Sequence, residues 1–540
     1  MDDKNHVYPN LSISEAVMSV AKECKDKKAM TYLGRAISYK KLLFKVERLS
    51  VALFEIGIQK GDRVLVALPN VPQAVYVLYA LNRIGAVPVF VSPLSAEAEL
   101  EFYINKCTCD FVIAIDMLYE KLLKVFEKTG DRVLVLTSPV DEIGFPFKSK
   151  KPKAVLWQNL FNIKKRGNIY ISPQKCDDTA VILFSGGTTG TPKAVELTNL
   201  NLNALAEGTE AACGQNVRGV KMLSVLPVFH GFGLGICIHT VLYFGGNAIL
   251  VPRFDRQQIG RVIAKSKPHY LAVVPAMLEP LMNSKVLEKA DLSCLLGVFS
   301  GGDSLSTELQ HSFNIFLLRH NSKVQIRQGF GLTECVAASC LMPDKEQRPQ
   351  SVGKPYPNTL YKIVKINTAD EVPSGEAGEI CISGNMVMKG YFDDEAETQK
   401  TLKTHSDGRV WLHTGDIGFM DNSGFVYFKQ RLKRIIVTNG YNVYPSEIEK
   451  VLLMHEKVKD CCVVGVKDKR KIQAVVVFAV LNSPRDESED TKTELLKHLE
   501  SYISLQAKPK EIFFIRNIPK TPMKKTAYAE LESIAESNMN

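Results

Sequence analysis

Up to about residue 300, the chain alternates between short apolar runs and amphipathic stretches of helical length. Residues 72–83 and 118–128 have the apolar spacing of helices. The runs between such stretches are rich in Val, Ile, Leu and Phe and have the length of buried strands. This alternation predicts layered α/β sheets. The predicted strands are residues 63–68, 87–91, 111–115, 132–136, 179–184, 222–226, 247–251, 270–274 and 296–299.

The pattern changes after residue 378, where short strands and turns replace the longer alternation. This part predicts a β-rich subdomain attached to the large α/β domain, which we place at residues 1–430. A compact α+β domain is predicted for residues 431–540, and the polar run 482–492 within it is predicted to be a solvated loop. The strands predicted after residue 378 are 378–383, 410–412, 424–429, 435–438, 461–466 and 474–480, and a helix is predicted at 445–455.

Composition places the chain among ordinary globular proteins. Its residues are 45% hydrophobic and 23% charged. A chain of 540 residues is too long for one hydrophobic core, so we expect several domains. The most apolar region, residues 64–91, is interrupted by polar residues such as Asn70 and Arg83, so we predict no transmembrane segment. The N-terminus has neither a basic region nor an apolar stretch after it. We therefore expect a cytoplasmic protein, with peripheral membrane attachment left open.

Charge and cysteine content narrow the choice of partners. The net charge of +10 comes from 68 basic residues interleaved with 58 acidic ones, without an aromatic and basic recognition motif. We therefore expect no nucleic acid partner, and a small polyanion accounts for the charge equally well. The 12 cysteines lack paired C-x-x-C spacing, which indicates reduced thiols rather than a zinc site.

One loop is rich in groups that bind phosphate. It follows the apolar run 180–184 and combines glycines, hydroxyl side chains and one lysine. Glycines let backbone amides turn toward an anion, hydroxyls add donors, and lysine adds positive charge. The spacing differs from the G-x-x-x-x-G-K-[ST] loop of kinases and GTPases, and a plain surface turn is the alternative. The loop consists of Ser185, Gly186, Gly187, Thr188, Thr189, Gly190, Thr191, Pro192 and Lys193.

Six further segments follow this loop in an order that resembles the motifs of the adenylate-forming superfamily. The resemblance extends from about residue 30 to 530 and is greatest to fatty-acyl and 4-coumarate-like aryl coenzyme A ligases. Each motif alone is moderately specific, but the seven together in one order argue strongly against coincidence. The six segments are residues 226–231 (LPVFHG), 300–302 (SGG), 328–335 (QGFGLTEC), 411–416 (WLHTGD), 431–445 (from RLK to GYNVYP) and 519–525 (PKTPMKK).

The resemblance implies a two-step reaction and assigns residues to the first step. A carboxylate is repelled by the polyanion it must attack, so positive charge and a metal ion have to gather on the phosphates. By resemblance, the 185–193 loop binds the β- and γ-phosphates, Thr333 contacts the α-phosphate, and Glu334 binds Mg²⁺. Taken alone, Glu334 could equally be an acid at a helix N-terminus.

The same resemblance assigns the nucleoside. Asp416 is implied to accept hydrogen bonds from the ribose hydroxyls, and Arg431 also reaches the ribose. Local sequence alone also allows a turn-forming Asp416 and an Arg431 that forms an interdomain salt bridge. The residues implied to form the adenine slot, which could also be tight turns, are Gly301, Gly302, Gln328, Gly329, Phe330 and Gly331.

The resemblance also assigns residues to movement and to the second step. Lys525 is implied to be the catalytic lysine of adenylation, although a Lys524-Lys525 pair stands where a Gly-Lys pair is usual. Lys433 is implied to be the hinge on which the small domain swings, and Gly440 to approach the pantetheine arm. His230 is implied to gate the passage between the acyl pocket and the thiol tunnel. The alternatives are solvated lysines, a plain turn at Gly440 and a core histidine.

These assignments predict an ATP- and Mg²⁺-dependent ligase that joins a carboxylic acid to coenzyme A through an acyl adenylate. A medium- or long-chain fatty acid is the first choice of substrate, and an aromatic acid remains open. One alternative is an enzyme that loads the acyl group onto a carrier protein. A more distant alternative is an inactive protein that binds an acyl group or a nucleotide.

Overall fold

The structure is a computed structural model, and it describes most of the chain. The described residues are 8–143, 151–163, 174–185, 192–214, 217–438, 441–468, 472–500, 502–503, 507–520 and 526–539. Among the predicted site residues, Gly186, Gly187, Thr188, Thr189, Gly190, Gly440 and Lys525 lie outside these ranges. In the described part, no helix has the length and apolarity needed to span a bilayer.

The first sheet has eight strands in the order β19-β9-β8-β4-β3-β5-β6-β7. The strands from β8 to β7 pair in parallel, whereas β9 and β19 are antiparallel additions at one edge. All five strands predicted up to residue 184 are present in this sheet. Its strands are β3 (Arg63–Ala67), β4 (Val87–Phe90), β5 (Phe111–Ile115), β6 (Val133–Thr137), β7 (Val155–Leu156), β8 (Thr179–Ser185), β9 (Lys193–Thr198) and β19 (Gly390–Tyr391).

The second sheet has nine strands in the order β16-β15-β14-β13-β12-β10-β11-β1-β2. Its central strands, from β14 to β1, are parallel, so their carboxyl ends meet at one edge. The strands are β1 (Lys28–Tyr32), β2 (Arg35–Ser38), β10 (Lys221–Ser224), β11 (Asn247–Leu250), β12 (Tyr270–Val273), β13 (Gly297–Ser300), β14 (Ile326–Phe330), β15 (Cys340–Leu341) and β16 (Lys354–Pro355).

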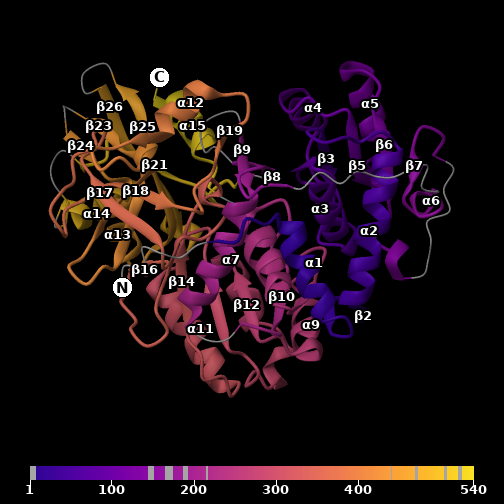
Figure 1. The fold of residues 1–540 in the computed structure, drawn as a ribbon. Coiled ribbons are helices and arrows are strands. Elements are labelled where there is room, and N and C mark those ends of the chain that lie inside the picture. Colours follow the sequence, from indigo (N-terminus) through magenta and orange to yellow (C-terminus); the bar gives the residue numbers. More distant parts are fainter. Residues whose placement is uncertain are drawn as a thin grey trace.

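Helices cover these two sheets, and Figure 1 shows the parallel strands of the first sheet in indigo to magenta and strands β10 to β14 of the second in magenta to salmon. Helix α3 (Pro72–Ile84) is buried on nearly every side, because it packs against other helices as well as the sheet. It starts with proline at its first turn and ends at Gly85, whose φ of +79° suits glycine. The other helices here are α1 (Ile13–Glu23), α2 (Tyr39–Glu55), α4 (Glu97–Lys106), α5 (Tyr119–Thr129), α6 (Trp157–Leu160), α7 (Asn199–Cys213), α8 (Val241–Tyr243), α9 (Ile259–Ser266), α10 (Leu278–Met282) and α11 (Thr307–Arg319).

The β-rich part that was predicted after residue 378 is a five-stranded antiparallel sheet. Its order is β17-β18-β21-β20, and β22 pairs with the far end of β21. Strand β21 is the longest strand of this sheet and pairs with three of its other strands. The elements are β17 (Thr359–Val364), β18 (Gly378–Gly384), β20 (Leu402–Thr404), β21 (Val410–Met420), β22 (Val426–Arg431) and the helix α12 (Glu395–Thr401).

The C-terminal part has its own sheet, in the order β24-β23-β26-β25, with β27 parallel to β26. Two apolar clusters on the faces of this sheet are separate from the large cluster of the N-terminal part. The solvated loop predicted at 482–492 is partly wrong, because α14 begins at Glu489. The elements are β23 (Ile436–Thr438), β24 (Tyr441–Val443), β25 (Val458–Asp468), β26 (Ile472–Leu481), β27 (Glu511–Phe514), α13 (Pro445–Leu453), α14 (Glu489–Glu500) and α15 (Tyr528–Met539).

One buried histidine in the large domain makes stability depend on pH. His239 lies in the π-helix η3 (Phe232–Thr240), with Nδ1 3.2 Å from the Tyr79 hydroxyl and Nε2 3.1 Å from Asn203 Oδ1. Burial lowers its pKa from 6.5 to about 3. The folded state therefore keeps a neutral ring over a pH range where the unfolded chain binds a proton.

We predict that stability decreases as the pH falls from about 6.5 toward 3, because only the unfolded state is protonated at this residue in that window. The variant His239→Gln should lose about 2 kcal/mol less between pH 7.5 and 5 than the parent. Urea unfolding at both pH values measures this difference. The exposed His311→Gln is the control, and an equal loss in His239→Gln and the parent would contradict the assignment.

Candidate nucleotide and acyl site

The residues predicted to form an adenine slot come together at the carboxyl edge of the second sheet. Ser300 at the end of β13 is in register with Gln328 of β14. Gly301 follows directly, and a Cβ atom there would lie 3.2 Å from the Phe232 ring and 3.6 Å from the Gly329 carbonyl oxygen. In parallel α/β sheets this edge is where ligands bind. The predicted residues at this edge are Gly301, Gly302, Gln328, Gly329, Phe330 and Gly331.

A close backbone contact fixes this edge against the start of η3. A Cβ atom on Gly231 would overlap the Val336 carbonyl, and one on Gly331 would overlap the Ala337 carbonyl. Val336 is fully buried and has a φ of +64°, which is rare for a β-branched residue. Surrounding packing must hold such a strained residue in place, and strain of this kind is concentrated at functional sites.

His230 lies just before η3, next to this contact. Its N–H donates to the Pro227 carbonyl at 3.0 Å, and its own carbonyl accepts the N–H of Leu234 at 2.8 Å. The imidazole is partly buried, and its ring centroid is 5.2 Å from that of Phe229. His230, for which the resemblance implies a gating role, therefore has a fixed backbone at the edge of the sheet.

Glu334 lies in the short 3₁₀ turn η6 (Thr333–Cys335), directly after β14. Its Oε1 accepts the hydroxyl of Tyr391 at 3.0 Å, and its carbonyl accepts the N–H of Met388 at 2.8 Å. The carboxylate is partly exposed, so its oxygens can reach a ligand. Thr333 heads the same turn, and its carbonyl accepts the N–H of Val336 at 2.9 Å.

Lys193 lies close to the Glu334 turn. Ser185 at the end of β8 pairs with Lys193 at the start of β9, so the two ends of the predicted phosphate loop are joined. The Lys193 ammonium is 4.8 Å from the centroid of the Tyr391 ring and forms an ion pair with Glu397 of α12. Tyr391 therefore links the loop lysine to the candidate metal ligand.

Tyr391 and Glu397 are site residues that the sequence reasoning missed. Both follow the apolar turn at Val387 and Met388, in a stretch without a recognisable binding motif. Pairing of β19 with β9, which puts Tyr391 opposite Val195, brings them to the loop. A distant strand pairing of this kind leaves no local signal in the sequence.

Asp416 and Arg431 form an ion pair across two neighbouring strands. They are in register on β21 and β22, and Arg431 Nε lies 2.7 Å from Asp416 Oδ1. The Asp416 carboxylate is 1% exposed, whereas the arginine side chain is 45% exposed. The arginine of the pair is therefore accessible from outside, whereas the aspartate is buried and held by its strand.

Two observations relate this ion pair to the rest of the site. The Phe330 ring of β14 is 6.1 Å from the Phe428 ring of β22. Burial raises the pKa of the Cys335 thiol to about 11, and the charges of Glu334 and Asp416 act in the same direction. The charges of the candidate metal ligand and the candidate ribose ligand therefore both act on the same buried thiol.

A buried polar network supports the strand that carries Asp416. Glu379 Oε1 accepts the N–H of Gly415 at 3.0 Å, and Oε2 lies 2.8 Å from His413 Nδ1. His413 Nε2 is in turn 2.9 Å from His405 Nε2. Burial opposes ionisation of Glu379, yet the hydrogen bonds and charge of His413 and the Gly415 amide hold its pKa below the usual value. The network thus orients the turn before Asp416.

Cys381 completes a set of possible metal ligands with Glu379 and His413, whose donor atoms all lie within 4.8 Å of one another. Both carboxylate oxygens of Glu379 and both ring nitrogens of His413 already have protein partners. Burial raises the pKa of the Cys381 thiol, which disfavours the thiolate that a metal ion would need. We therefore interpret the cluster as a hydrogen-bonded support.

The remaining predicted residues are at the domain boundary or outside the described ranges. Lys433 is exposed in η7 (Leu432–Arg434), two residues after Arg431. The flanks of the segment with Lys525 face each other, since Lys520 bridges to Thr526 and its Nζ is 3.2 Å from Thr526 Oγ1. The assignments of Lys525 and Gly440 remain predictions from the sequence.

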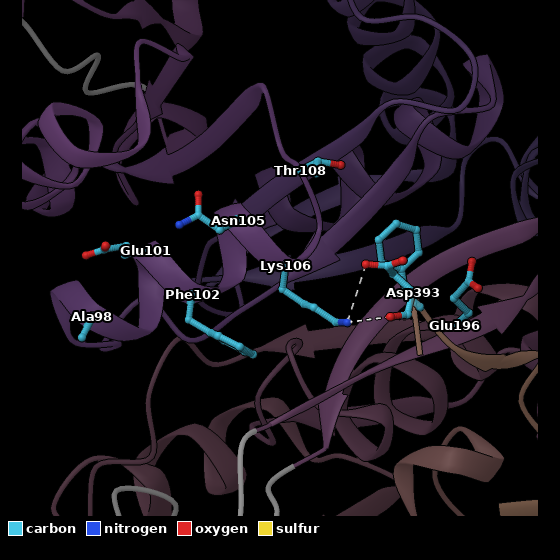
Figure 2. Close-up of a pocket in the computed structure, with 9 residues that line it drawn as sticks. Ala98, Glu101, Phe102, Asn105, Lys106, Thr108, Glu196 and Asp393 are labelled. Carbon is cyan, nitrogen blue, oxygen red and sulfur yellow. Dashed lines mark hydrogen bonds and ion pairs between the residues drawn. The ribbon is translucent and has the colours of Figure 1, made fainter. Parts of the chain in front are cut away.

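A surface cavity of about 940 Å³ lies between α4 and the segment after β19 (Figure 2). Lys106 crosses it, with Nζ 2.9 Å from the Asp393 carbonyl and 3.9 Å from Asp393 Oδ2. Two lining residues, Glu196 and Phe392, lie near Lys193 and Tyr391 in sequence. None of the lining residues is a predicted site residue. The contact of Lys106 instead ties the segment before α12 to the first sheet.

Family models match most of the chain. The AMP-binding enzyme family matches residues 18–392, and the AMP-binding enzyme C-terminal domain matches residues 447–525. The chain therefore belongs to the AMP-binding enzyme family, and the resemblance found in the sequence is confirmed.

Two relatives show which members of the family the chain is similar to. It is 32% identical over 539 residues to the long-chain-fatty-acid–CoA ligase of Bacillus subtilis (strain 168), covering 96% of this chain and 93% of that one. It is 30% identical over 520 residues to 4-coumarate–CoA ligase-like 2 of Arabidopsis thaliana, covering 94% of this chain and 87% of that one.

Solved structures confirm the predicted α/β fold with a small α+β domain. ATP-bound MatB from Rhodopseudomonas palustris superposes with a TM-score of 0.85 at 22% identity, covering 98% of this chain and 100% of that one. The anthranilate CoA ligase AuaEII with anthranoyl-AMP gives a TM-score of 0.83 at 20% identity, covering 100% and 99%.

We predict that Tyr391→Phe weakens Mg²⁺ binding, because it removes the hydroxyl that holds Glu334 Oε1. Loss of one hydrogen bond to a charged group should raise the Mg²⁺ concentration needed for half-maximal pyrophosphate release by about tenfold. Titration of Mg²⁺ at saturating ATP measures this. The control Tyr427→Phe removes a hydroxyl bonded to Asp421 at 3.3 Å. Equal Mg²⁺ requirements in the two variants would refute the role of Tyr391.

Proposed function

We propose that this chain is an ATP-dependent acyl-CoA ligase that activates a carboxylic acid as an acyl adenylate and transfers it to coenzyme A. The observation that carries the proposal is the convergence of Lys193, Glu334 and the Asp416–Arg431 pair, which come from three different sheets. Family membership and the names of the relatives support the same activity.

In the first step, a carboxylate oxygen of the acid attacks the α-phosphorus of ATP, and the bond to pyrophosphate breaks. The loop that ends at Lys193 would hold the leaving phosphates by charge and hydrogen bonds. Asp416 and Arg431 would hold the ribose, since a fixed carboxylate can accept hydrogen bonds from both hydroxyls. The sheet edge from Gly301 to Gly331 would receive the adenine ring.

The residues present fit a magnesium ion. Glu334 offers a hard carboxylate donor that Tyr391 links to Lys193, and the Tyr391 hydroxyl fixes the direction of one of its oxygens. A bound Mg²⁺ would neutralise phosphate charge as pyrophosphate leaves. Glu334 is the residue of this chain that would hold the ion.

In the second step, the thiol of coenzyme A attacks the carbonyl carbon of the adenylate, and AMP leaves. We propose that the small domain turns about Lys433 between the two steps. The described contacts across this boundary include polar ones that can exchange: Ser446 Oγ to Gln430 Oε1 at 3.2 Å, Lys429 Nζ to Glu447 Oε1 at 3.4 Å and Lys450 Nζ to Gln350 Oε1 at 3.3 Å. Such interfaces permit domain motion.

A small apolar cavity supports an apolar acid. It has a volume of about 20 Å³, and Ile236 of η3, Tyr270 at the amino end of β12 and Phe299 of β13 line it. A volume of this size holds about one water molecule, so an acyl chain has to displace side chains to enter. The relatives named for long-chain fatty acids favour a medium- or long-chain fatty acid.

One observation favours an aromatic acid as the second candidate. Tyr270 and Phe299 both line this cavity and stack with centroids 5.6 Å apart at 19°. Parallel rings at the wall of a pocket suit a flat ligand.

A panel of carboxylic acids tests the function. Purified protein with Mg²⁺, ATP and coenzyme A should release pyrophosphate and form a thioester, detected by mass, with chains of medium or long length preferred over acetate and cinnamate. A preference for cinnamate would favour the aryl alternative. Pyrophosphate release that coenzyme A does not increase would indicate a carrier protein as the acceptor, and no release with any acid would refute ligase activity.

The catalytic lysine is tested by two neighbouring variants. Lys525→Ala should slow acyl adenylate formation by about 10²- to 10³-fold, because one preorganised charge at the reacting phosphate is lost. Lys524→Ala should adenylate at the parent rate. Single-turnover formation of acyl-AMP measures both, and the reverse pattern would move the assignment to Lys524.

A further inference from the structure

The side chain of Lys193 already has an anionic partner in this structure. Glu397, in the first turn of α12, forms an ion pair with the Lys193 ammonium, and both side chains are about one-third exposed. Partial burial makes such a pair stronger than one on the open surface. The same ammonium that would meet the phosphates of ATP is therefore held by a carboxylate.

The backbone fixes Glu397 in this position. Its N–H donates to Asp394 Oδ1 at 3.1 Å, which caps α12. Thr398 Oγ1 accepts the N–H of Tyr391 at 2.9 Å, so the helix is tied to β19, which in turn pairs with β9. Glu397 and Lys193 thus face each other from two connected elements and need no further ordering to pair.

Glu397 also has a second cationic partner. Lys400, one turn further along α12, lies with Nζ 3.6 Å from Glu397 Oε2. If Lys193 leaves, the carboxylate keeps this lysine and is not left unpaired. The pair between Lys193 and Glu397 can therefore open at low cost when a more highly charged anion competes for Lys193.

We propose that Glu397 is a positioning residue that holds Lys193 when the phosphate site is empty and thereby lowers the affinity of the site for ATP and pyrophosphate. This inference rests on the proposed function, which places the phosphates at Lys193. ATP takes Lys193 from Glu397 on binding, and Glu397 takes it back as pyrophosphate leaves. The residue sets nucleotide affinity and product release without touching the reacting atoms.

The variant Glu397→Gln tests this proposal. The Kd for Mg·ATP without acid, measured by calorimetry, should decrease by about three- to tenfold, because no carboxylate competes for Lys193. The inhibition constant of pyrophosphate should decrease by a similar factor, and kcat should not increase. Glu397→Asp keeps the charge and should lie between the parent and Glu397→Gln.

Glu395→Gln is the matched control. It removes one negative charge from the same helix, where Glu395 Oε1 accepts Gln399 Nε2 at 2.9 Å. Its Kd for Mg·ATP should stay within about twofold of the parent. An unchanged or weaker affinity in Glu397→Gln, or an equal gain in both variants, would overturn the proposal.

The double variant Lys193→Met/Glu397→Gln separates action through Lys193 from direct repulsion of the nucleotide. Against Lys193→Met alone, it should show no gain in affinity. A gain that persists would overturn the proposal, as would ATP binding by Lys193→Met equal to the parent. If ATP binding follows the expected pattern but no acid yields a thioester, the proposed function fails and this inference stands.

Discussion

The site depends on one strand pairing, that of β19 with β9 at the edge of the first sheet. Lys193 begins β9, and Tyr391 ends β19, so the pairing joins positions almost 200 residues apart in the chain. Tyr391 then reaches Glu334, which follows the last parallel strand of the second sheet. Through this pairing, Tyr391 connects the loop lysine to the candidate metal ligand.

The charged groups of the site are held by polar partners rather than by apolar packing. Asp416 is buried beside Arg431, and the turn before it is fixed by Glu379 and His413. A buried charge without partners would be very unfavourable, and Arg431 supplies the Asp416 carboxylate with an ion-pair partner. The arrangement holds carboxylates in fixed orientations at an edge where the cationic and anionic parts of a nucleotide complex can meet.

The sequence predicted the sheets well, because parallel strands buried on both faces appear as short apolar runs. It also assigned Gly301 and Gln328 to one adenine slot by resemblance, and the register of β13 and β14 puts Ser300 beside Gln328. It missed Tyr391 and Glu397, whose positions depend on a long-range pairing, and it missed the start of α14 because that helix begins with polar residues that face solvent. The residues 186–190 and Lys525 remain assignments from resemblance.

The position of Glu397 suggests a reason for an enzyme of this kind to lower its own affinity for a substrate. An interaction made equally with ATP before and during the reaction tightens binding without lowering the barrier. A lysine shared with Glu397 is available to the phosphates only when their charge exceeds that of the carboxylate. In the proposed reaction, the same sharing favours the departure of pyrophosphate before the thiol step. A carboxylate beside a phosphate-binding lysine is therefore consistent with a site that has to empty between two reactions.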